Sequence, residues 1–568
     1  MKPERPRAHT IIIMAKLSLV PLLLASARAL PHNFIFYQPD EMRAESLGCY
    51  GHAVSKTPNF DAFAASGTRF DQAHTSYTVC TQSRAAFMTA WPTHVMGHRS
   101  LWNLLHEWEP NLLKYLKAAG YAVKWWGKND LLAHDSFNAS VTTAMSKGGT
   151  LNGPNEFAFG EPGYYSFLSK PTPTNQTSDR RNVEAAIEYL LDPQRDQSQP
   201  FMIFLPLSKP HPPYSCPEPW YSSIDPRSLP PLRPSGLSGK PDYHALIRDY
   251  RNLTTLDEGF FRRLHAVYLG SIAYTDFLFG LLLAALDASG QRDSTTVAVF
   301  ADHGDYAGDY GLVEKWPSGL EDVLTRVPLL MRTPRGKPGH VVAEPVQLFD
   351  IVPTVLELAG INASHVHFGS SLVAPLHGAA GTRDAVFAEG GYSTHEPRDF
   401  EGDAASGGVG DEKAIYYPKL LQQQEKPLSV CRAVSVRTLT HKLVLRTDPL
   451  DGDHHSELYD LRADPLELRN VYGHPGHEKV QADLTQRILR WMLTTSDVTR
   501  WELDPRSGGY PWPTRGGPRG ARAVDVAVDT GFGVGEQQGL DLQNQITPQG
   551  ALHLEKEPRE HGDVVWLA

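Results

Sequence analysis

Cysteine is scarce in this sequence: four occur among 568 residues, too few for a disulfide-stapled fold. Positive charge is also in deficit, because 54 Lys and Arg face 64 Asp and Glu for a formal net charge of −10, which argues against a nucleic-acid-binding protein. After the N-terminal segment we find no apolar run of membrane-spanning length and no internal repeat, so no membrane anchor is expected. The remaining composition, 41% apolar and 21% charged, is typical of a globular chain of enzyme size.

The N-terminus has the pattern of a secretory signal peptide. Basic residues precede the apolar stretch Ile11–Leu24, and small residues follow it, so residues 1–29 are expected to be removed. Met14 is an alternative start, because the run after it forms a complete signal alone. The mature protein is therefore expected to be secreted or to reside in the lumen of the secretory or a lysosome-like compartment. Four N-glycosylation sequons support this expectation: Asn138, Asn175, Asn252 and Asn362.

Strand-like and helix-like segments alternate along the first two thirds of the chain. Short apolar strands are expected at Asn33–Tyr37, Tyr121–Trp126, Phe201–Leu207 and Thr295–Phe300. Helical spacing is expected at Pro58–Ser66, Ser83–Ala90, Asn111–Ala119, Phe260–Ala288 and Val346–Ala359. This alternation predicts an α/β catalytic domain over residues 30–384, with a large, mostly parallel sheet sandwiched by helices.

From about Ala385 the pattern changes to short strands separated by turns. Strands are expected at Ala385–Ala388, Ala433–Arg437, Lys442–Leu445 and Glu457–Tyr459, followed by a helix at Lys479–Thr494. We expect a smaller C-terminal α+β domain with an antiparallel sheet over residues 385–505. Residues 506–568, rich in Gly, Pro and Gln, are expected to form a tail. The long stretches Leu132–Asn175 and Pro212–Leu256 are interpreted as lids and pocket walls.

Four apolar strands are each followed by a polar side chain of catalytic type. Taken singly, each has an ordinary explanation: a strand-end Asp caps helices, a loop Lys is solvated, and a His between prolines marks an extended loop. In a parallel sheet, however, the carboxyl ends of the strands meet at one edge, where ligands bind. The coincidence of four such positions predicts a site built from Asp40, Lys128, His211 and Asp302.

Acidic residues at two of these strand ends suggest a metal site. Clustered carboxylates with few thiols suit Ca²⁺ or Mg²⁺, and a histidine among them also admits Mn²⁺ or Zn²⁺. The candidate ligands are Asp40, Glu41, Asp302 and His303. Such an ion would polarise one oxygen of an anionic ester, while nearby cationic side chains bind the same anion and supply protons. The candidates for that second role are Arg84, Lys128, His211 and Lys315.

Several of these segments resemble the motifs of the sulfatase family, within the alkaline-phosphatase-like superfamily. CTQSRAAFMTA at 80–90 is similar to the signature C-x-P-S-R-x-x-x-x-T-G. DHGDYAGDYGLVEK at 302–315 matches D-H-G-E-x-x-G-D-x-G-x-x-x-K with one Glu-to-Asp change. Further similar blocks are NFIFYQPDEMRAESLGCYG (33–51), GYAVKWWGK (120–128), SKPHPPY (208–214) and ELYDLRADPLELRNV (457–471). The resemblance covers about residues 33–475 and is closest in kind to iduronate sulfatases and arylsulfatases.

The resemblance implies a formylglycine-dependent sulfuric ester hydrolase. Cys80 would be converted to formylglycine by a formylglycine-generating enzyme, and its hydrate would be the nucleophile. Arg84 and Lys128 would hold that hydrate and the sulfate, and His211 and Lys315 would contact the sulfate and assist the leaving group. One Ca²⁺, with Mg²⁺ or Mn²⁺ as alternatives, would be bound by Asp40, Glu41, Asp302 and His303. The substrate would be a sulfated small molecule or saccharide.

Besides the Glu-to-Asp change within residues 302–315, the sequence departs from the family pattern at four further positions. Glu41 and Asp130 replace a common Asp and His, and Gln82 and Ala90 replace the Pro and Gly of the signature. The signature Pro helps the maturation enzyme to recognise the segment, yet Cys80 and Arg84 are intact, so partial or complete conversion of Cys80 is expected. Two alternatives stay open: a phosphodiesterase or phosphonate monoester hydrolase of the same superfamily, and a metal-binding protein that has lost catalysis.

Overall fold

The computed structural model describes residues 32–498, apart from positions 147, 151, 394–395, 397–410 and 448–455. The described residues belong to one compact unit of the chain. The expected signal peptide at 1–29 and tail at 506–568 lie outside the described residues, and the boundary expected near residue 385 stays a prediction.

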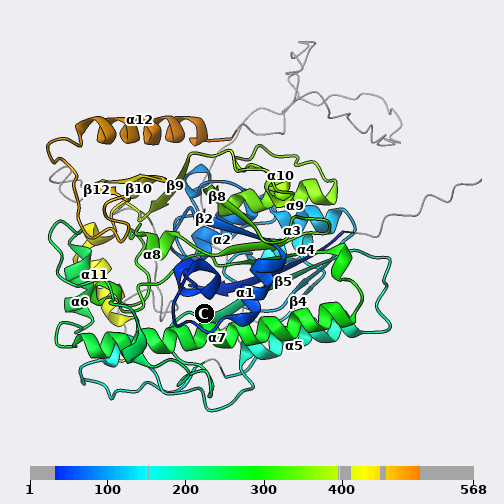
Figure 1. Cartoon of the computed structure of the whole chain (residues 1–568), viewed down its shortest axis with the longest axis horizontal. Coiled ribbons are helices and arrows are strands. Elements are labelled where there is room, and N and C mark those ends of the chain that lie inside the picture. The colour runs from blue at the N-terminus through cyan, green and yellow to red at the C-terminus, as the bar shows by residue number, and fades with distance from the viewer. Residues whose placement is uncertain are drawn as a thin grey trace, which may run out of the picture. The chain divides into compact units, whose positions relative to one another are not determined.

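A large eight-stranded sheet forms the centre of this unit (Figure 1). Seven strands run parallel to one another, and β7 is antiparallel to both of its neighbours, β6 and β2. The strand order is β4 (Thr143–Ala144), β3 (Ala122–Trp125), β5 (Phe201–Pro210), β1 (Asn33–Asp40), β6 (Thr295–Phe300), β7 (Leu329–Arg332), β2 (Thr68–His74) and β8 (His340–Gln347). The expected large, mostly parallel sheet is therefore confirmed.

Helices cover both faces of this sheet, which explains why its central strand is apolar throughout. Every residue of β1 is buried, as expected for a strand covered on both sides. Tyr37 packs toward one face, against Phe60 and Phe279, whereas Phe36 contacts Phe300, which packs on Phe87 of the other face. The first face carries α1 (Pro58–Ser66), α5 (Ser178–Leu191) and α7 (Glu258–Ala288), and the second α2 (Cys80–Thr89), α3 (Leu112–Ala118) and α9 (Ile351–Ala359) (Figure 1).

No apolar run of membrane-spanning length was found in the sequence after the N-terminal segment. Helix α7 corrects that statement, because by length and composition it could cross a membrane. In the structure 72% of its most apolar window is buried, against α5, α1 and β5. Its hydropathy is therefore explained by packing on the sheet, as in the core helix of a globular domain.

The second sheet is smaller and fully antiparallel, as expected. Its order is β12 (Glu457–Asp460), β11 (His441–Arg446), β10 (Ala433–Thr438) and β9 (Ala385–Gly390). Helix α12 (Glu478–Thr495) packs on it, with the Trp491 ring stacked on Phe387 at 4.9 Å. Helices α6 (Tyr243–Tyr250) and α11 (Tyr417–Glu425) pack together beside it, and three short helices complete the set: α4 (Phe137–Ser140), α8 (Asp322–Thr325) and α10 (Val373–Leu376).

Sequence patterns found most elements but missed some that have mixed polarity or a very short apolar run. Strands β2 and β7 were not predicted, and helix α5 lies in a stretch whose pattern was not interpreted. The helix expected over Val346–Ala359 begins only at Ile351, because residues 340–347 pair with β2 as β8. Helix α2 starts at Cys80 rather than Ser83, since Val79 is extended and ends the preceding loop.

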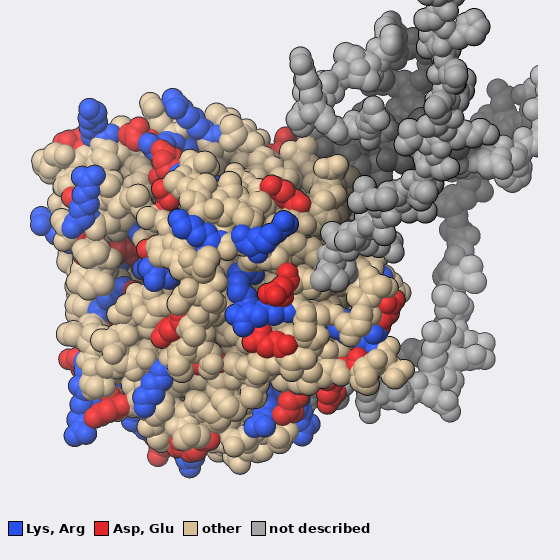
Figure 2. All heavy atoms as spheres, turned by 45° about the vertical axis from the view of Figure 1, so that its right-hand side comes forward, with Lys and Arg blue, Asp and Glu red and all other residues tan. Residues whose placement is uncertain are grey.

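Surface charge is of mixed sign on the face drawn in Figure 2, where Lys and Arg are interspersed with Asp and Glu. The cations of the predicted site differ from these surface groups in being buried: the side chains of Arg84 and Lys315 are 0% exposed. Buried cations require carboxylate or anion partners, so carboxylates are expected close to both side chains.

Candidate active site

The four polar strand ends predicted from the sequence do meet at one edge of the large sheet. Strands β3, β5, β1 and β6 are consecutive neighbours and mutually parallel, so their carboxyl ends lie side by side. Gly127 makes room for the Lys128 loop, because a Cβ there would lie 2.1 Å from the Pro206 carbonyl oxygen. The close approach lets the Lys128 backbone N–H donate to that oxygen at 2.9 Å.

Cys80 is the first residue of α2 and lies in the middle of this group. Its Sγ is 3.3 Å from His303 Nε2, 3.5 Å from Asp40 Oδ1 and 3.9 Å from Lys128 Nζ. The residue is buried, and burial together with the Asp40 carboxylate raises the pKa of the thiol well above its usual value. An unmodified Cys80 is therefore held as a neutral thiol, which is a poor nucleophile.

Arg84 ties together the two carboxylates that follow β1 and β6. Its Nη2 donates to Asp40 Oδ2 and its Nε to Asp302 Oδ2, both at 2.9 Å. Lys128 Nζ also donates to Asp40 Oδ2 at 2.9 Å. Burial alone would raise the pKa of Asp40, but Lys128 and Arg84 outweigh it and hold that pKa well below the usual range. Asp40 is therefore kept ionised, as a metal ligand has to be.

Glu41 anchors the other half of the site. Its Oε1 lies 2.6 Å from Lys315 Nζ and 3.1 Å from His211 Nε2, and these two nitrogens are 3.2 Å apart. Its backbone has a φ of 65°, a left-handed conformation that is strained for a long side chain, and Tyr268 holds it by donating to the Glu41 carbonyl oxygen. Burial raises the pKa of Glu41 well above normal, although Lys315 opposes the shift.

Three of the four predicted metal ligands offer donor atoms to one common position. The donor atoms of Asp40, Glu41, His303 and Cys80 all lie within 4.8 Å of one another. Glu41 Oε2 is buried and has no hydrogen-bond partner in the described part of the chain, as expected of an oxygen that awaits a cation. The donor set, rich in carboxylate oxygen, fits a hard divalent ion.

Asp302, the fourth predicted ligand, is adjacent, and both of its carboxylate oxygens already accept hydrogen bonds from the protein. Its Oδ1 accepts the backbone N–H of Glu41 at 3.2 Å and of His303 at 3.0 Å, and its Oδ2 accepts from Arg84. The side chain thus joins the two ligand-bearing loops in this structure. Gly304, the next residue but one, has no space for a side chain, because a Cβ would lie 1.9 Å from the Val323 carbonyl oxygen.

The structure adds residues that the sequence patterns did not assign to the site. Asp130 lies 2.8 Å from Lys128 Nζ; it was noted as a departure from the family pattern but given no role. Glu314 Oε1 lies 3.0 Å from Lys315 Nζ and accepts from Lys419 of α11 at 2.8 Å. No sequence signal could have placed Lys419, since it is about a hundred residues away and follows no motif.

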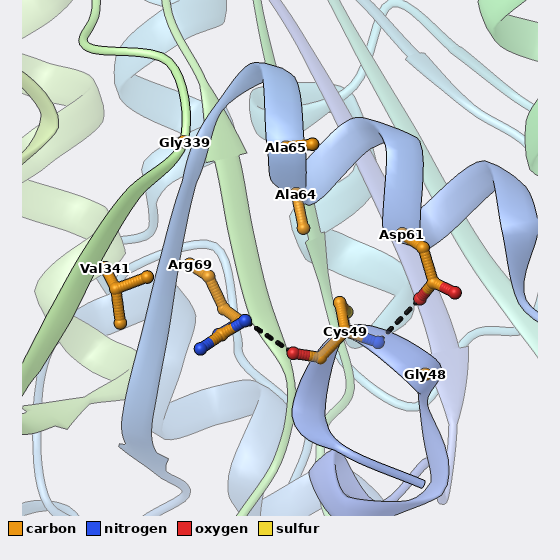
Figure 3. Close-up of a pocket in the computed structure, with 8 residues that line it drawn as sticks. All are labelled: Gly48, Cys49, Asp61, Ala64, Ala65, Arg69, Gly339 and Val341. Carbon is orange, nitrogen blue, oxygen red and sulfur yellow. Dashed lines mark hydrogen bonds between the residues drawn. The ribbon is translucent and has the colours of Figure 1, made fainter. Parts of the chain in front are cut away.

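A separate surface pocket lies at the opposite edge of the sheet (Figure 3). It has a volume of about 340 Å³ and is lined by Cys49, Asp61 and Arg69, among others. In Figure 3, Arg69 and Asp61 both bond the Cys49 backbone, so the polar groups shown there satisfy each other. Arg69 and Val341 mark the amino ends of β2 and β8, far along the strands from the carboxyl-end site.

Comparison with known proteins identifies the family. The sulfatase family model matches residues 32–361, and a model described as the C-terminal region of N-sulphoglucosamine sulphohydrolase matches residues 396–493. An uncharacterized sulfatase of Escherichia coli, YidJ, is 27% identical over 83% of this chain and 90% of its own length. An N-acetylglucosamine-6-O-sulfatase of Bacteroides thetaiotaomicron is 24% identical over 80% of this chain and 85% of its own.

Solved structures agree at the level of the fold. A phosphonate monoester hydrolase of Agrobacterium radiobacter superposes with a TM-score of 0.65 at 21% identity, over 82% of this chain and 96% of that protein. The family model covers more than half of the chain, and the motif residues it spans converge on one buried site. The chain therefore belongs to the sulfatase family of the alkaline-phosphatase-like superfamily and is a sulfuric ester hydrolase.

Proposed function

We propose that this protein is a secreted or lumenal sulfatase that hydrolyses sulfate monoesters to an alcohol and inorganic sulfate. The observation that carries the proposal is the position of Cys80, whose Sγ lies within 4 Å of Asp40, Lys128 and His303 in one buried cluster. Formylglycine formed from Cys80 by a formylglycine-generating enzyme supplies the nucleophilic hydroxyl when present. One divalent cation, for which Ca²⁺ is our choice on ligand chemistry, supplies Lewis-acid stabilisation of the anion.

The residues around Cys80 have separate tasks in this proposal. Asp40, Glu41 and His303 would hold the cation, with Asp302 fixing the loops that carry two of them. Arg84 and Lys128 present positive charge to the ester oxygens from the side of β3 and α2. His211 accepts from Lys315 at Nε2 while its Nδ1 donates to the Pro212 carbonyl oxygen at 2.5 Å. A proton for the leaving oxygen is thus available from the Lys315–His211 pair.

The secretory location is supported by the four sequons. Asn138, Asn175, Asn252 and Asn362 are all exposed, as an acceptor for N-glycosylation has to be. A sulfated saccharide is the substrate class that we favour, because a relative covering most of the chain is named for a sulfated amino sugar. A panel of sulfated sugars, steroids and aryl esters would identify the physiological substrate.

The test uses full-length protein from a eukaryotic secretory host. Turnover of 4-nitrophenyl sulfate, together with mass spectrometry of the peptide containing Cys80, checks activity and maturation in the same sample. We expect turnover that scales with the formylglycine fraction and is lost on chelation of the metal. Turnover by protein that carries only an alkylatable Cys80 thiol would refute the formylglycine mechanism.

A second candidate activity is hydrolysis of phosphonate monoesters or phosphodiesters. The likeness to a phosphonate monoester hydrolase over 82% of the chain favours it at the level of the fold. These esters share the single negative charge and tetrahedral shape of sulfate monoesters, so the same cationic shell could bind both. Parallel assays with matched sulfate and phosphonate esters distinguish them, and absence of all turnover with metal still bound would support a non-catalytic binding protein.

A further inference from the structure

Asp130 places a carboxylate among the cations that bind the substrate anion. It follows Lys128 by two residues in the loop after β3, and its Oδ2 lies 2.8 Å from Lys128 Nζ and 3.9 Å from Arg84 Nη1. The loop is fixed by Asn129, whose Oδ1 accepts the backbone N–H groups of Leu131 and Leu132 at 3.2 and 3.0 Å. The loop that carries the carboxylate is therefore fixed, and the ion pair with Lys128 keeps the Asp130 side chain at the site.

Lys128 and Arg84, the two cations next to Asp130, are paired with carboxylates, which weakens their attraction for a substrate anion. Lys128 Nζ is shared between Asp40 Oδ2 at 2.9 Å and Asp130 Oδ2 at 2.8 Å. Arg84 uses Nε and Nη2 on Asp302 and Asp40, whereas its buried Nη1 has no hydrogen-bond partner among the described residues and lies nearest to Asp130. An ester oxygen bound between these groups meets the Asp130 charge at close range.

Exposure shows which side chains border the opening of the site. The side chains of Arg84, Asp40, Asp302 and Lys315 are 0% exposed, whereas those of Lys128 and Asp130 are each 17% exposed and that of His211 is 16%. Among these seven side chains, Asp130, Lys128 and His211 are the partly exposed ones, so an anion arriving from solvent meets them before the fully buried groups. A charge at that position acts on every substrate.

We propose that Asp130 sets the charge selectivity of the site, favouring esters with one negative charge over dianionic phosphate monoesters. The inference rests on the proposed function of this site. With a divalent ion bound and Asp40, Glu41 and Asp302 ionised as its ligands and neighbours, the charges of Arg84, Lys128 and Lys315 would leave a formal charge of plus two. Asp130 would lower it to plus one. The second negative charge of a phosphate monoester then meets repulsion from Asp130 instead of a matching cation.

The experiment compares three esters of one leaving group, so that charge is the variable that changes. 4-Nitrophenyl sulfate and 4-nitrophenyl phenylphosphonate are monoanions, and 4-nitrophenyl phosphate is close to a dianion at about pH 8. Each is assayed with wild type, Asp130→Asn, Asp130→Glu and Asp135→Asn. Asp135 is the control because it lies just after this loop, in the short helix His134–Ser136, where it is exposed and pairs with His106.

We expect Asp130→Asn to raise the ratio of kcat/KM for phosphate over sulfate by about tenfold or more. Asp130→Glu, which keeps the charge, and Asp135→Asn should leave the ratio within about twofold of wild type. The phosphonate should follow the sulfate, because both are monoanions. An equal loss for all three esters in Asp130→Asn would show that Asp130 merely positions Lys128 and would overturn the inference.

A binding measurement separates this inference from the proposed function. Thermal shift titrations with benzenesulfonate, a monoanion, and phenylphosphonate, which is close to a dianion at about pH 8, report charge preference in protein that need not turn over. If wild type hydrolyses no sulfate ester, the proposed function fails, yet a higher phosphonate-over-sulfonate affinity ratio in Asp130→Asn would still uphold the charge role. An unchanged affinity ratio together with an unchanged kinetic ratio would reject it.

Discussion

Arg84 joins the two carboxylates that follow β1 and β6. Its guanidinium spans Asp40 and Asp302 with two separate nitrogens at 2.9 Å, and all three side chains are 0% exposed. In a dry interior each of these carboxylates would be costly without a partner. A planar group with several fixed donors can serve both at once, which a single ammonium cannot do.

Arg84→Lys should therefore be far from conservative. We expect kcat/KM for 4-nitrophenyl sulfate to fall by about 10²-fold and the free energy of unfolding by about 1–3 kcal/mol, since one buried carboxylate loses its charged partner. Enzyme kinetics and urea denaturation measure the two effects. Arg69→Lys is the control, because Arg69 pairs with Asp71 on a partly exposed surface away from the site. Wild-type kinetics in Arg84→Lys would contradict the bridging role.

Residues that stand in a motif could be assigned to the candidate site from the sequence, and their roles stay predictions. Asp40, Cys80, Arg84 and Lys315 all stand at recognisable spacings, and the structure brings them together. Contacts between residues far apart in the sequence could not be predicted unless a motif marks both residues. The contact of Lys419 with Glu314 joins two segments whose proximity is set by tertiary packing, and no local pattern encodes it.

At the scale of elements, the start of α2 decides how the segment that begins with Cys80 is presented. Cys80, Thr81 and Gln82 form the first turn, and Ser83 makes the first bond of the helix, to the Val79 carbonyl oxygen. N–H groups in the first turn of a helix have no intrahelical acceptor, so a proline is tolerated there. Position 82 is therefore compatible with the proline of the family signature.

Gln82→Pro should raise the fraction of Cys80 converted to formylglycine while changing the melting temperature by no more than a few degrees. The physical reason is that proline favours the extended segment before modification and fits the first helical turn after folding. Peptide mass spectrometry and thermal denaturation measure the two quantities. Ser83→Pro is the matched comparison: it removes the donor to Val79 and should destabilise the protein. No gain in conversion would show that Gln82 does not limit maturation.

Helix α11 reaches the site through Lys419. The buried Lys419 ammonium contacts Glu314 Oε1 at 2.8 Å, and the same oxygen lies 3.0 Å from Lys315 Nζ, so α11 helps to hold Lys315 against Glu41. Outer partners of this kind typically matter about 10–100-fold in activity. The part of the chain beyond the large sheet thus contacts a residue of the candidate site, Lys315, through Glu314.

Lys419→Gln should lower kcat/KM for 4-nitrophenyl sulfate by about tenfold or more. The loss should appear mainly in kcat, because Lys315 would be displaced from the leaving group while Arg84 and Lys128 still bind the anion. Lys426→Gln, at the exposed end of the same helix, is the control and should behave as wild type. A kcat within twofold of wild type in Lys419→Gln would exclude the coupling.

Helices and strands could be predicted from the sequence where their apolar residues form a long buried run. β1, β6 and α7 contain apolar runs long enough to be found from the sequence, whereas β2, with the sequence TRFDQAH, has polar side chains that remain half-buried. β7 could not be found because its four residues give too short a pattern, and its antiparallel direction is a property of the finished sheet.

At the scale of the whole molecule, buried histidines make stability depend on pH. Burial lowers the pKa of His365 to about 4, well below the value of an unfolded histidine. His365 is satisfied while neutral: Nε2 contacts the Thr89 carbonyl oxygen at 2.8 Å and Nδ1 the Tyr115 hydroxyl at 2.7 Å. A folded pKa below the unfolded one means that this stabilisation is present at neutral pH and is lost as pH falls from about 6.5 toward 4.

His365→Gln isolates this contribution. Glutamine can bond Thr89 and Tyr115 but does not titrate. The unfolding free energy that is lost between pH 7 and pH 5 should therefore be about 2 kcal/mol smaller in His365→Gln than in wild type. Urea denaturation at the two pH values measures it. His106→Gln, on an exposed side chain, is the control and should track wild type. Identical pH dependence in wild type and His365→Gln would show that His365 does not titrate on unfolding.

The position of β1 has a consequence for how the protein is made. This strand is synthesised first but lies in the middle of the sheet, and its neighbours β5 and β6 are added only when residues 201–210 and 295–300 follow. At ribosomal rates of about 5–20 residues per second, β1 waits for about 15–50 s before both edges can pair. During that interval an apolar strand needs protection by chaperones, and Cys80, buried once the sheet has closed, is still open to a modifying enzyme. On the proposed formylglycine mechanism, the order of strands would thus set a translation-timed window for the maturation of Cys80.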